Sequence, residues 1–150
     1  MAKTKPIEIV NRKAGFNFHA EQKFSVGMML TGTEVKSIRA GNINMGDAYA
    51  MVEDDELWLK NLHISPYSQS SFAQHDPMRN RKLLITKKEL KKIVVAVKNK
   101  GIAVFPIRLF ENERGIFKLE IGVGPGKKTH DKREDIKSRD VERELSRLKR

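Results

Sequence analysis

The stretch GKKTHDKREDIKSRD, from Gly126 to Asp140, gathers many of the residues in this sequence that are able to do chemistry. A glycine before two lysines resembles part of a phosphate-binding loop, but that loop requires the spacing G-x-x-x-x-G-K-[ST]. Ile121 stands where the motif needs its first glycine, and Lys128 stands where a serine or threonine must bind magnesium. The spacing therefore excludes a nucleotide-hydrolysing loop of this type.

The four histidines are not spaced like metal ligands. His19, His63, His75 and His130 are widely scattered, and no two of them have the separation of a ligand pair. The chain also has no cysteine, which excludes thiolate metal sites, cysteine nucleophiles and disulfides. We therefore expect neither a metal nor a cofactor.

A hydrolytic site could be imagined from Glu34, His75 and Asp76. Histidine and carboxylates act as general acids and bases, yet no spacing brings these three together. The nucleophile motif G-x-S-x-G is absent from the sequence. A solvated His75–Asp76 pair in a polar loop is the simpler interpretation. We expect a protein that is not an enzyme, with a nuclease as the enzymatic alternative.

The charge of the chain favours a nucleic-acid partner. Lysine and arginine total 30 against 19 acidic residues, a formal net charge of +11. Such a balance is typical of proteins that release counterions from a polyanion. The last 25 residues hold ten cations and six acids, a net of +4, and the rest carries +7. Two separate contact surfaces are therefore predicted.

The last 25 residues contain few large apolar side chains. Val141, Leu145 and Leu148 fall at helical spacing and form one narrow stripe. That stripe buries too little apolar area to order the segment alone. We predict a tail that is disordered in the free protein and helical on a partner; the alternative is a frayed helix packed on the body.

The elements that must position these residues are mostly short strands. Apolar runs at 18–24, 48–52, 57–64, 102–110 and 116–123 are bounded by turn residues. Within 26–40, one interpretation is a strand with a bulge at Gly32, and the other is a helix over 34–40 that ends at Gly41. Pro106 predicts an edge position or a bulge.

One helix is predicted with more support than the others. Thr86 and Glu89 form a capping-box pattern, apolar residues follow at helical spacing, and Gly101 ends the run. Several strands and one capped helix predict a mainly β protein, a small OB-like β-barrel with a helix. No run is long enough for a signal peptide or a membrane span, so we expect a cytoplasmic protein.

Three runs and one short signature resemble a known family. They are GTEVKSIRAGN (32–42), DPMRNRKLLITKKEL (76–90), IGVGPGKKTHDKREDIKSRD (121–140) and the tetrapeptide NRKA (11–14). Together they resemble the SsrA-binding protein family, also called small protein B, over nearly the whole chain. Thr33 and Gly15-Phe16 depart from residues frequent in that family.

The resemblance implies a partner of transfer-messenger RNA (tmRNA) in the rescue of stalled ribosomes. An OB-like body, residues 1–125, is implied to hold the tRNA-like domain of this RNA. The tail, residues 126–150, is implied to enter the decoding centre and the empty messenger channel, with Gly124 to Gly126 as its hinge. Elongation factor Tu with GTP is an implied partner through the RNA, and the protein is implied to be a monomer without a membrane role.

The family's contacts can be carried over by position. The implied tmRNA contacts are Asn11, Arg12, Lys13, Glu34, Lys36, Arg39, Asn42, Arg79, Arg81 and Lys82. The implied ribosome contacts in the tail are Lys127, Lys128, His130, Asp131, Lys132, Arg133, Lys137 and Arg139.

Two parts of this set differ in their chemistry. Lys36 and Arg39 are three residues apart and would share one face of a helical turn, which suits phosphates. Glu34 cannot attract a phosphate. It either accepts hydrogen bonds from base or ribose groups or forms a buried structural ion pair, and the residues alone favour neither. The alternative for the whole chain is a generic OB-fold protein that binds single-stranded RNA or the ribosome.

Overall fold

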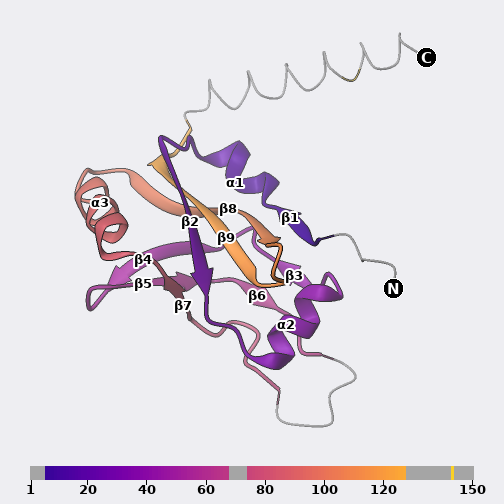
Figure 1. Cartoon of the computed structure of the whole chain (residues 1–150). Helices are drawn as coiled ribbons and strands as arrows, with labels where there is room; N and C mark the ends of the chain where they lie inside the picture. The colour runs from indigo at the N-terminus through magenta and orange to yellow at the C-terminus, as the bar shows by residue number, and fades with distance from the viewer. Residues whose placement is uncertain (1–5, 68–73, 128–142, 144–150) are drawn as a thin grey trace.

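The computed structural model describes residues 6–67, 74–127 and 143, which form a mainly β architecture with helices at its ends (Figure 1). The helices are α1 (Arg12–Asn17), α2 (Gly32–Arg39) and α3 (Lys87–Val97). The strands are β1 (Glu8–Val10), β2 (Gln22–Met28), β3 (Ile43–Asn44), β4 (Tyr49–Glu53), β5 (Glu56–Lys60), β6 (His63–Ile64), β7 (Arg81–Leu84), β8 (Ile102–Glu111) and β9 (Phe117–Pro125).

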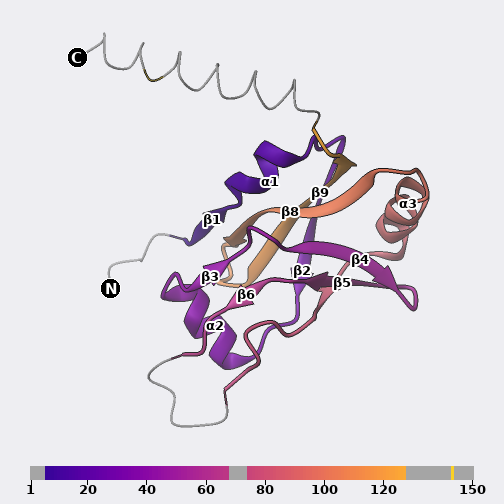
Figure 2. The same cartoon turned by 180° about the vertical axis from the view of Figure 1, so that it is seen from behind.

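Most of the strands close into an antiparallel barrel. Their order is β8-β4-β5-β7-β2-β9, and β9 pairs with β8 to complete the ring, while β1 adds to the other side of β8. Strands β3 and β6 form a separate two-stranded ribbon beside α2 (Figure 2). The predicted fold class, a small β-barrel with a capped helix, is confirmed.

The barrel forms because inward positions alternate with outward ones along each strand. Leu57 and Leu59 on β5 are fully buried, whereas Trp58 between them is only half-buried. The turn that joins β4 to β5 places Asp54 and Asp55 at positive φ, which is the requirement of a tight hairpin turn. The predicted turn at 53–56 is therefore confirmed, and the predicted strand at 57–64 is divided by Asn61, which also has positive φ.

The long hairpin of β8 and β9 contains an irregularity at Pro106. The pairing register shifts between Pro106 and Arg108. Proline cannot donate a ladder hydrogen bond, so the strand accommodates it with a bulge, as predicted. The strand itself is not an edge, because β8 has neighbours on both sides.

The region around Gly32 is a helix, so the predicted strand with a bulge is wrong. Thr31 caps α2 with its hydroxyl, and the Glu34 carboxylate accepts a 2.8 Å hydrogen bond from the backbone N–H of Thr31. This reciprocal capping box overrides the weak helix propensity of glycine and threonine. Gly41, at φ +81°, ends the helical segment as the alternative interpretation predicted.

Helix α3 has the predicted N-cap but only half of the predicted capping box. The Thr86 hydroxyl accepts from the backbone N–H of Glu89 at 3.2 Å. The Glu89 carboxylate, however, accepts from the Thr86 hydroxyl and not from its backbone N–H. The helix ends at Val97, and Gly101 at φ +85° turns the chain into β8.

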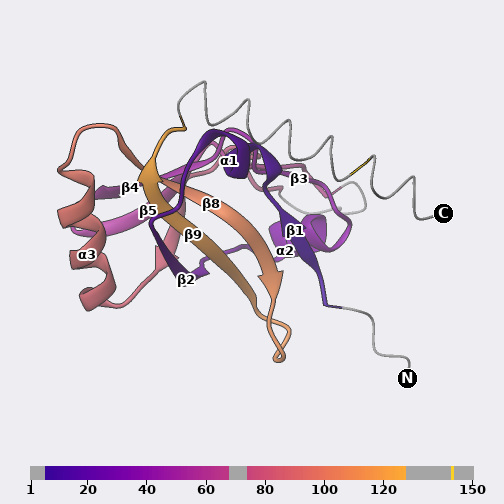
Figure 3. The ribbon, with the colours of Figure 1, turned by 90° about the horizontal axis from the view of Figure 1, so that it is seen from above.

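The three helices lie at separate places around the barrel. In Figures 1 and 3, α3 lies on one side, away from both α1 and α2, and α1 and α2 are also apart from each other. In the part of the chain that the structure describes, no helix is long and apolar enough to span a membrane.

Candidate RNA interface

Helix α1 is fixed to the barrel by the side chain of Asn11. Its Nδ2 donates to the carbonyl oxygens of Met45 and Pro106, at 3.1 and 2.9 Å, and its Oδ1 accepts from the N–H of Ala14. Asn11 is only 6% exposed. The geometry therefore favours a positioning role for this side chain over the predicted direct contact with RNA.

The two cations that follow Asn11 point to solvent. Lys13 forms an exposed ion pair with Asp47, 2.7 Å between Nζ and Oδ1, which solvent screening makes weak. Arg12 is exposed on α1 and makes no ion pair with the described residues. Both side chains can therefore reach an external phosphate.

Glu34 lies at the centre of a buried ion cluster. One carboxylate oxygen accepts from Arg79 Nη2 at 2.6 Å and from the N–H of Thr31, and the other accepts from Arg81 Nε. Glu34 and Arg81 are both 0% exposed. The remaining nitrogens of Arg81 donate to carbonyl oxygens, those of Leu62, Pro77 and Arg79. Of the two interpretations of Glu34, the geometry therefore supports the structural ion pair.

The ionisation of this cluster follows from its partners. Burial alone would raise the pKa of Glu34, but the hydrogen bonds from Arg79, Thr31 and Arg81 and the charge of Arg81 outweigh it, so its pKa lies below the usual value. Burial lowers the pKa of Arg81, and the neighbouring Glu34 opposes that change. The carboxylate is held ionised as the counter-charge of two guanidinium groups.

His75 helps to hold α2 in place and is buried, so the prediction of a solvated His75 is wrong. The ring is 8% exposed. Its Nε2 donates to the carbonyl oxygen of Ile64 at 2.8 Å, and its Nδ1 lies 2.8 Å from the Thr33 hydroxyl. With Glu34 held by arginines and both ring nitrogens of His75 engaged, neither residue is free to act as the base of the imagined acid–base group with Asp76.

The outer face of α2 carries exposed cations. Lys36 Nζ lies 5.6 Å from the centroid of the Tyr67 ring. Arg39 lies over the Phe117 ring and forms a 2.8 Å ion pair with Glu111. Asn42, just beyond the helix, is exposed, and its backbone holds the ribbon beside α2. All three residues are therefore accessible to an external ligand.

The basic run at 79–82 is not one surface. Arg81 points into the protein, whereas Lys82, the next residue on β7, points outward and pairs with Glu56 at 3.0 Å. Successive side chains of a strand face opposite sides, which explains the separation. Arg79 lies at the rim with 36% of its side chain exposed.

Most of the predicted tail contacts lie outside the described residues: Lys128, His130, Asp131, Lys132, Arg133, Lys137 and Arg139. Lys127 is described, and its backbone N–H donates to the Asn17 carbonyl at 2.7 Å. Gly124 and Pro125 pair with β8, and Gly126 forms a bridge with Phe18. The predicted hinge residues are therefore held by the barrel.

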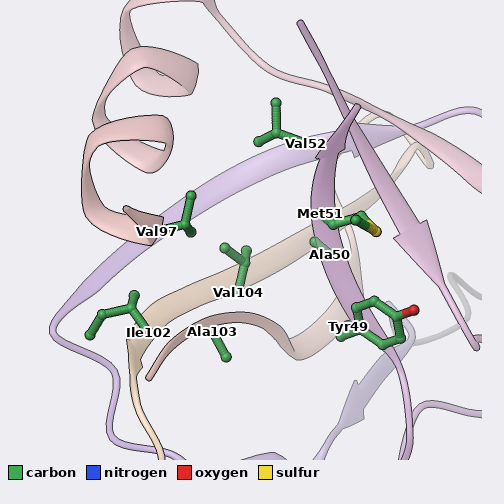
Figure 4. A pocket seen from close by; sticks show the side chains of 8 residues that line it. All are labelled: Tyr49, Ala50, Met51, Val52, Val97, Ile102, Ala103 and Val104. Atoms are coloured by element: carbon green, nitrogen blue, oxygen red, sulfur yellow. The ribbon is translucent and has the colours of Figure 1, made fainter. Parts of the chain in front are cut away.

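A groove of about 410 Å³ opens between β4, β8 and the end of α3 (Figure 4). Its lining is almost entirely apolar: Tyr49, Ala50, Met51, Val52, Val97, Ile102, Ala103 and Val104. No carboxylate or histidine lines it, and among the described residues no group of three histidine or acidic side chains could hold a metal ion. The groove therefore offers no acid–base chemistry.

Sequence reasoning missed three supporting residues of this interface. Thr31 carries a visible signal, because the acidic Glu34 follows it by three residues. Thr33 and His75 are 42 residues apart and carry no local signal that they would pair.

Comparison with known proteins identifies close relatives. The profile of the family described as SmpB protein matches residues 8–150. The SsrA-binding protein of Cytophaga hutchinsonii is 46% identical over 97% of this chain and 95% of its own length. That of Anaplasma marginale (strain Florida) is 50% identical over 96% of this chain and 98% of its own length.

A solved structure also resembles this one closely. It is described as "tmRNA-SmpB: a journey to the center of the bacterial ribosome", and its matching chain is 41% identical with a TM-score of 0.69. The similarity covers 81% of the present chain and 85% of that chain. At this identity the likeness concerns both sequence and fold.

Proposed function

Because the chain belongs to the SmpB protein family, we propose that it binds tmRNA and delivers it to stalled ribosomes. The body, residues 1–125, holds the tRNA-like domain of the RNA. The tail, residues 126–150, engages the ribosome. The observation that carries this proposal is the family match over residues 8–150, which includes the body and the tail together.

The exposed cations on α1 and α2 are the part of the body best suited to tmRNA. Phosphates are bound by accessible lysine and arginine, and these contacts set the orientation of the RNA. Surface cations of this kind are Arg12, Lys13, Lys36, Arg39 and Arg79, and the polar side chain of Asn42 is exposed as well. Asn11, Glu34 and Arg81 position them from inside, and Lys82 lies on the neighbouring outer face of β7.

The tail is proposed to act in the decoding centre, with its cations on rRNA phosphates and the His130 ring on an unpaired base. Elongation factor Tu with GTP is proposed to join through the tmRNA. The protein would then act in the cytoplasm as a monomer and without catalysis.

Removing residues 128–150 tests the division of labour. The shortened chain should bind the tRNA-like domain within about twofold of the full chain, because the proposed phosphate contacts of the body remain. Peptide tagging on ribosomes with truncated messages should be lost. Equal loss of RNA binding and tagging would contradict the division.

A matched pair of surface variants tests the body. Lys36→Gln with Arg39→Gln should weaken binding of the tRNA-like domain and lower the slope of log affinity against log salt by about two. Lys23→Gln with Lys118→Gln removes the same charge from β2 and β9 and should change little.

Equal competition by bulk single-stranded RNA would instead indicate the generic RNA binder, and cleavage of the RNA would indicate a nuclease.

A further inference from the structure

The surface around α3 carries a cluster of lysines that the proposed tmRNA contacts do not use. All six are exposed, and none forms an ion pair with a described residue: Lys87, Lys88, Lys91, Lys92, Lys98 and Lys100. By contrast, most cations elsewhere on the described barrel strands are paired, such as Lys60 with Glu53 and Arg108 with Glu120. No ion pair with a described residue therefore neutralises the α3 cluster, although Glu21 lines a pocket with Lys92, and Asp55 and Glu56 line another with Lys87.

The lysines of the helix share its outer face. At about 100° per residue, the four within α3 fall in an arc of about 140°, with Val95 inside that arc. Val95 is 64% exposed, whereas Ile93 on the inner face is fully buried. The one acidic residue of the helix, Glu89, lies outside this arc and accepts a hydrogen bond from the Thr86 hydroxyl.

This arrangement does not help the helix itself. Lys87 and Lys91, and likewise Lys88 and Lys92, are like charges at i and i+4, which repel. Lys87 and Lys88 also occupy the first turn, where the helix dipole disfavours positive charge. Because these like charges repel one another within the helix, their arrangement is better explained by an anionic partner that relieves the repulsion.

The chemistry of the face indicates which anion it fits. Single-stranded RNA is commonly bound by aromatic side chains on which its bases stack, and α3 has no aromatic residue. Lysines alone bind phosphates without reading sequence, as proteins do on duplex RNA. Helix α3 also lies away from α1 and from α2 on the barrel (Figure 3), so a partner on α3 and a partner on α1 and α2 can be bound together.

We propose that the lysine face of α3 binds the phosphate backbone of a duplex segment of ribosomal RNA while α1 and α2 hold the tRNA-like domain. The inference rests on the proposed function for its partner, the ribosome. It assigns to the body a ribosome contact separate from that of the tail.

Charge-matched double variants of the full chain test this inference. Two remove lysines of α3: Lys88→Gln with Lys92→Gln, and Lys87→Gln with Lys91→Gln. The control is Lys23→Gln with Lys118→Gln, cations of β2 and β9 that form no ion pair with a described residue. Affinity for purified ribosomes carrying a truncated message is measured at several salt concentrations, with and without the bound tRNA-like domain. Thermal unfolding checks the fold, and glutamine keeps the helix propensity.

Each α3 double should weaken ribosome binding roughly three- to tenfold and reduce the salt slope by about two. The control should change affinity less than about twofold, binding of the tRNA-like domain should be unchanged, and the Tm should stay level or rise because a repulsive pair is gone.

Three results would overturn the inference. They are an α3 effect equal to that of the control, a loss of affinity with an unchanged salt slope (which indicates a protein partner), and an equal loss of binding to the tRNA-like domain. Failure of the proposed function is a separate result: the unmodified chain would not prefer the tRNA-like domain to bulk RNA. The measurement on ribosomes without that RNA still decides the role of α3.

Discussion

At the scale of single residues, burial separates two kinds of polar side chain in this interface. Arg12, Lys36 and Arg39 are exposed and carry charge to the surface. Asn11 and Glu34 are buried, and their hydrogen-bonding groups are already used inside the protein. The exposed cations can bind RNA directly, and the buried polar residues determine where those cations lie.

Glu34→Ala should strongly destabilise the fold. It leaves Arg81, which is 0% exposed, without its counter-charge, and the removal of one partner of a buried ion pair costs about 3–5 kcal/mol. Urea denaturation measures this loss in the free energy of unfolding. Glu113→Ala, at an exposed position of the β8–β9 turn, should change it by less than about 0.5 kcal/mol. Similar values for the two variants would exclude a structural role for Glu34.

The lowered pKa of Glu34 predicts an acid-dependent loss of stability. Because the folded state binds this proton less tightly than the unfolded state, the stabilisation is fully present above the unfolded pKa of about 4.3. It is lost as the pH falls through the lower pKa of the folded state. The difference in unfolding free energy between the natural chain and Glu34→Gln should therefore shrink as the pH falls below about 4. A difference that stays constant from pH 7 to pH 3 would contradict the shift.

At the scale of elements, the two helices with a threonine N-cap, α2 and α3, allow stability and binding to be separated. Thr31→Ala and Thr86→Ala each remove an N-cap and should lower the unfolding free energy by about 1 kcal/mol. Only α2 carries proposed tmRNA contacts, so only Thr31→Ala should also weaken binding of the tRNA-like domain. Denaturation and filter binding on both variants make the comparison. A loss of binding in Thr86→Ala of the same size would mean that stability alone controls affinity.

The end of β9 allows a second matched comparison. A Cβ at Gly124 would lie 1.8 Å from the carbonyl oxygen of His19, whereas one at Gly126 would lie 3.8 Å from its nearest neighbour, the Asn17 carbonyl oxygen. Gly124→Ala must therefore displace backbone and should cost about 1–3 kcal/mol or more. Gly126→Ala should be close to neutral or slightly stabilising, by about 0.4–1 kcal/mol. Equal effects in thermal unfolding would show that the contact between His19 and β9 adapts to the added carbon.

At the scale of the whole molecule, the sequence correctly predicted the elements that are determined by residues close together in the chain. Alternation, the turn at 53–56 and the Thr86 cap identified the hairpins and α3, because each signal lies within a few residues. Long-range contacts had no such signal: Glu34 and Arg81 are 47 residues apart. For the same reason the run at 79–82 seemed to be one basic surface, although the strand divides it between the two faces of β7. The α2 error arose because glycine and threonine outweighed a capping box that was present in the sequence.

The division between body and tail is a property of the whole chain. The unfolding free energies of truncated chains test where the body ends. The backbone N–H groups of His19 and Lys127 donate to Pro125 and Asn17, at 2.9 and 2.7 Å, so residues through Lys127 belong to the barrel network. Truncation after Lys127 should leave the unfolding free energy within about 0.5 kcal/mol. Truncation after Val123 should lower the unfolding free energy by about 2 kcal/mol or more. This truncation removes these hydrogen bonds and the pairing of Gly124 and Pro125 with β8. If truncation after Lys127 already lowers the unfolding free energy that far, residues 128–150 pack on the body, and the alternative of a helix packed on the barrel replaces the independent tail.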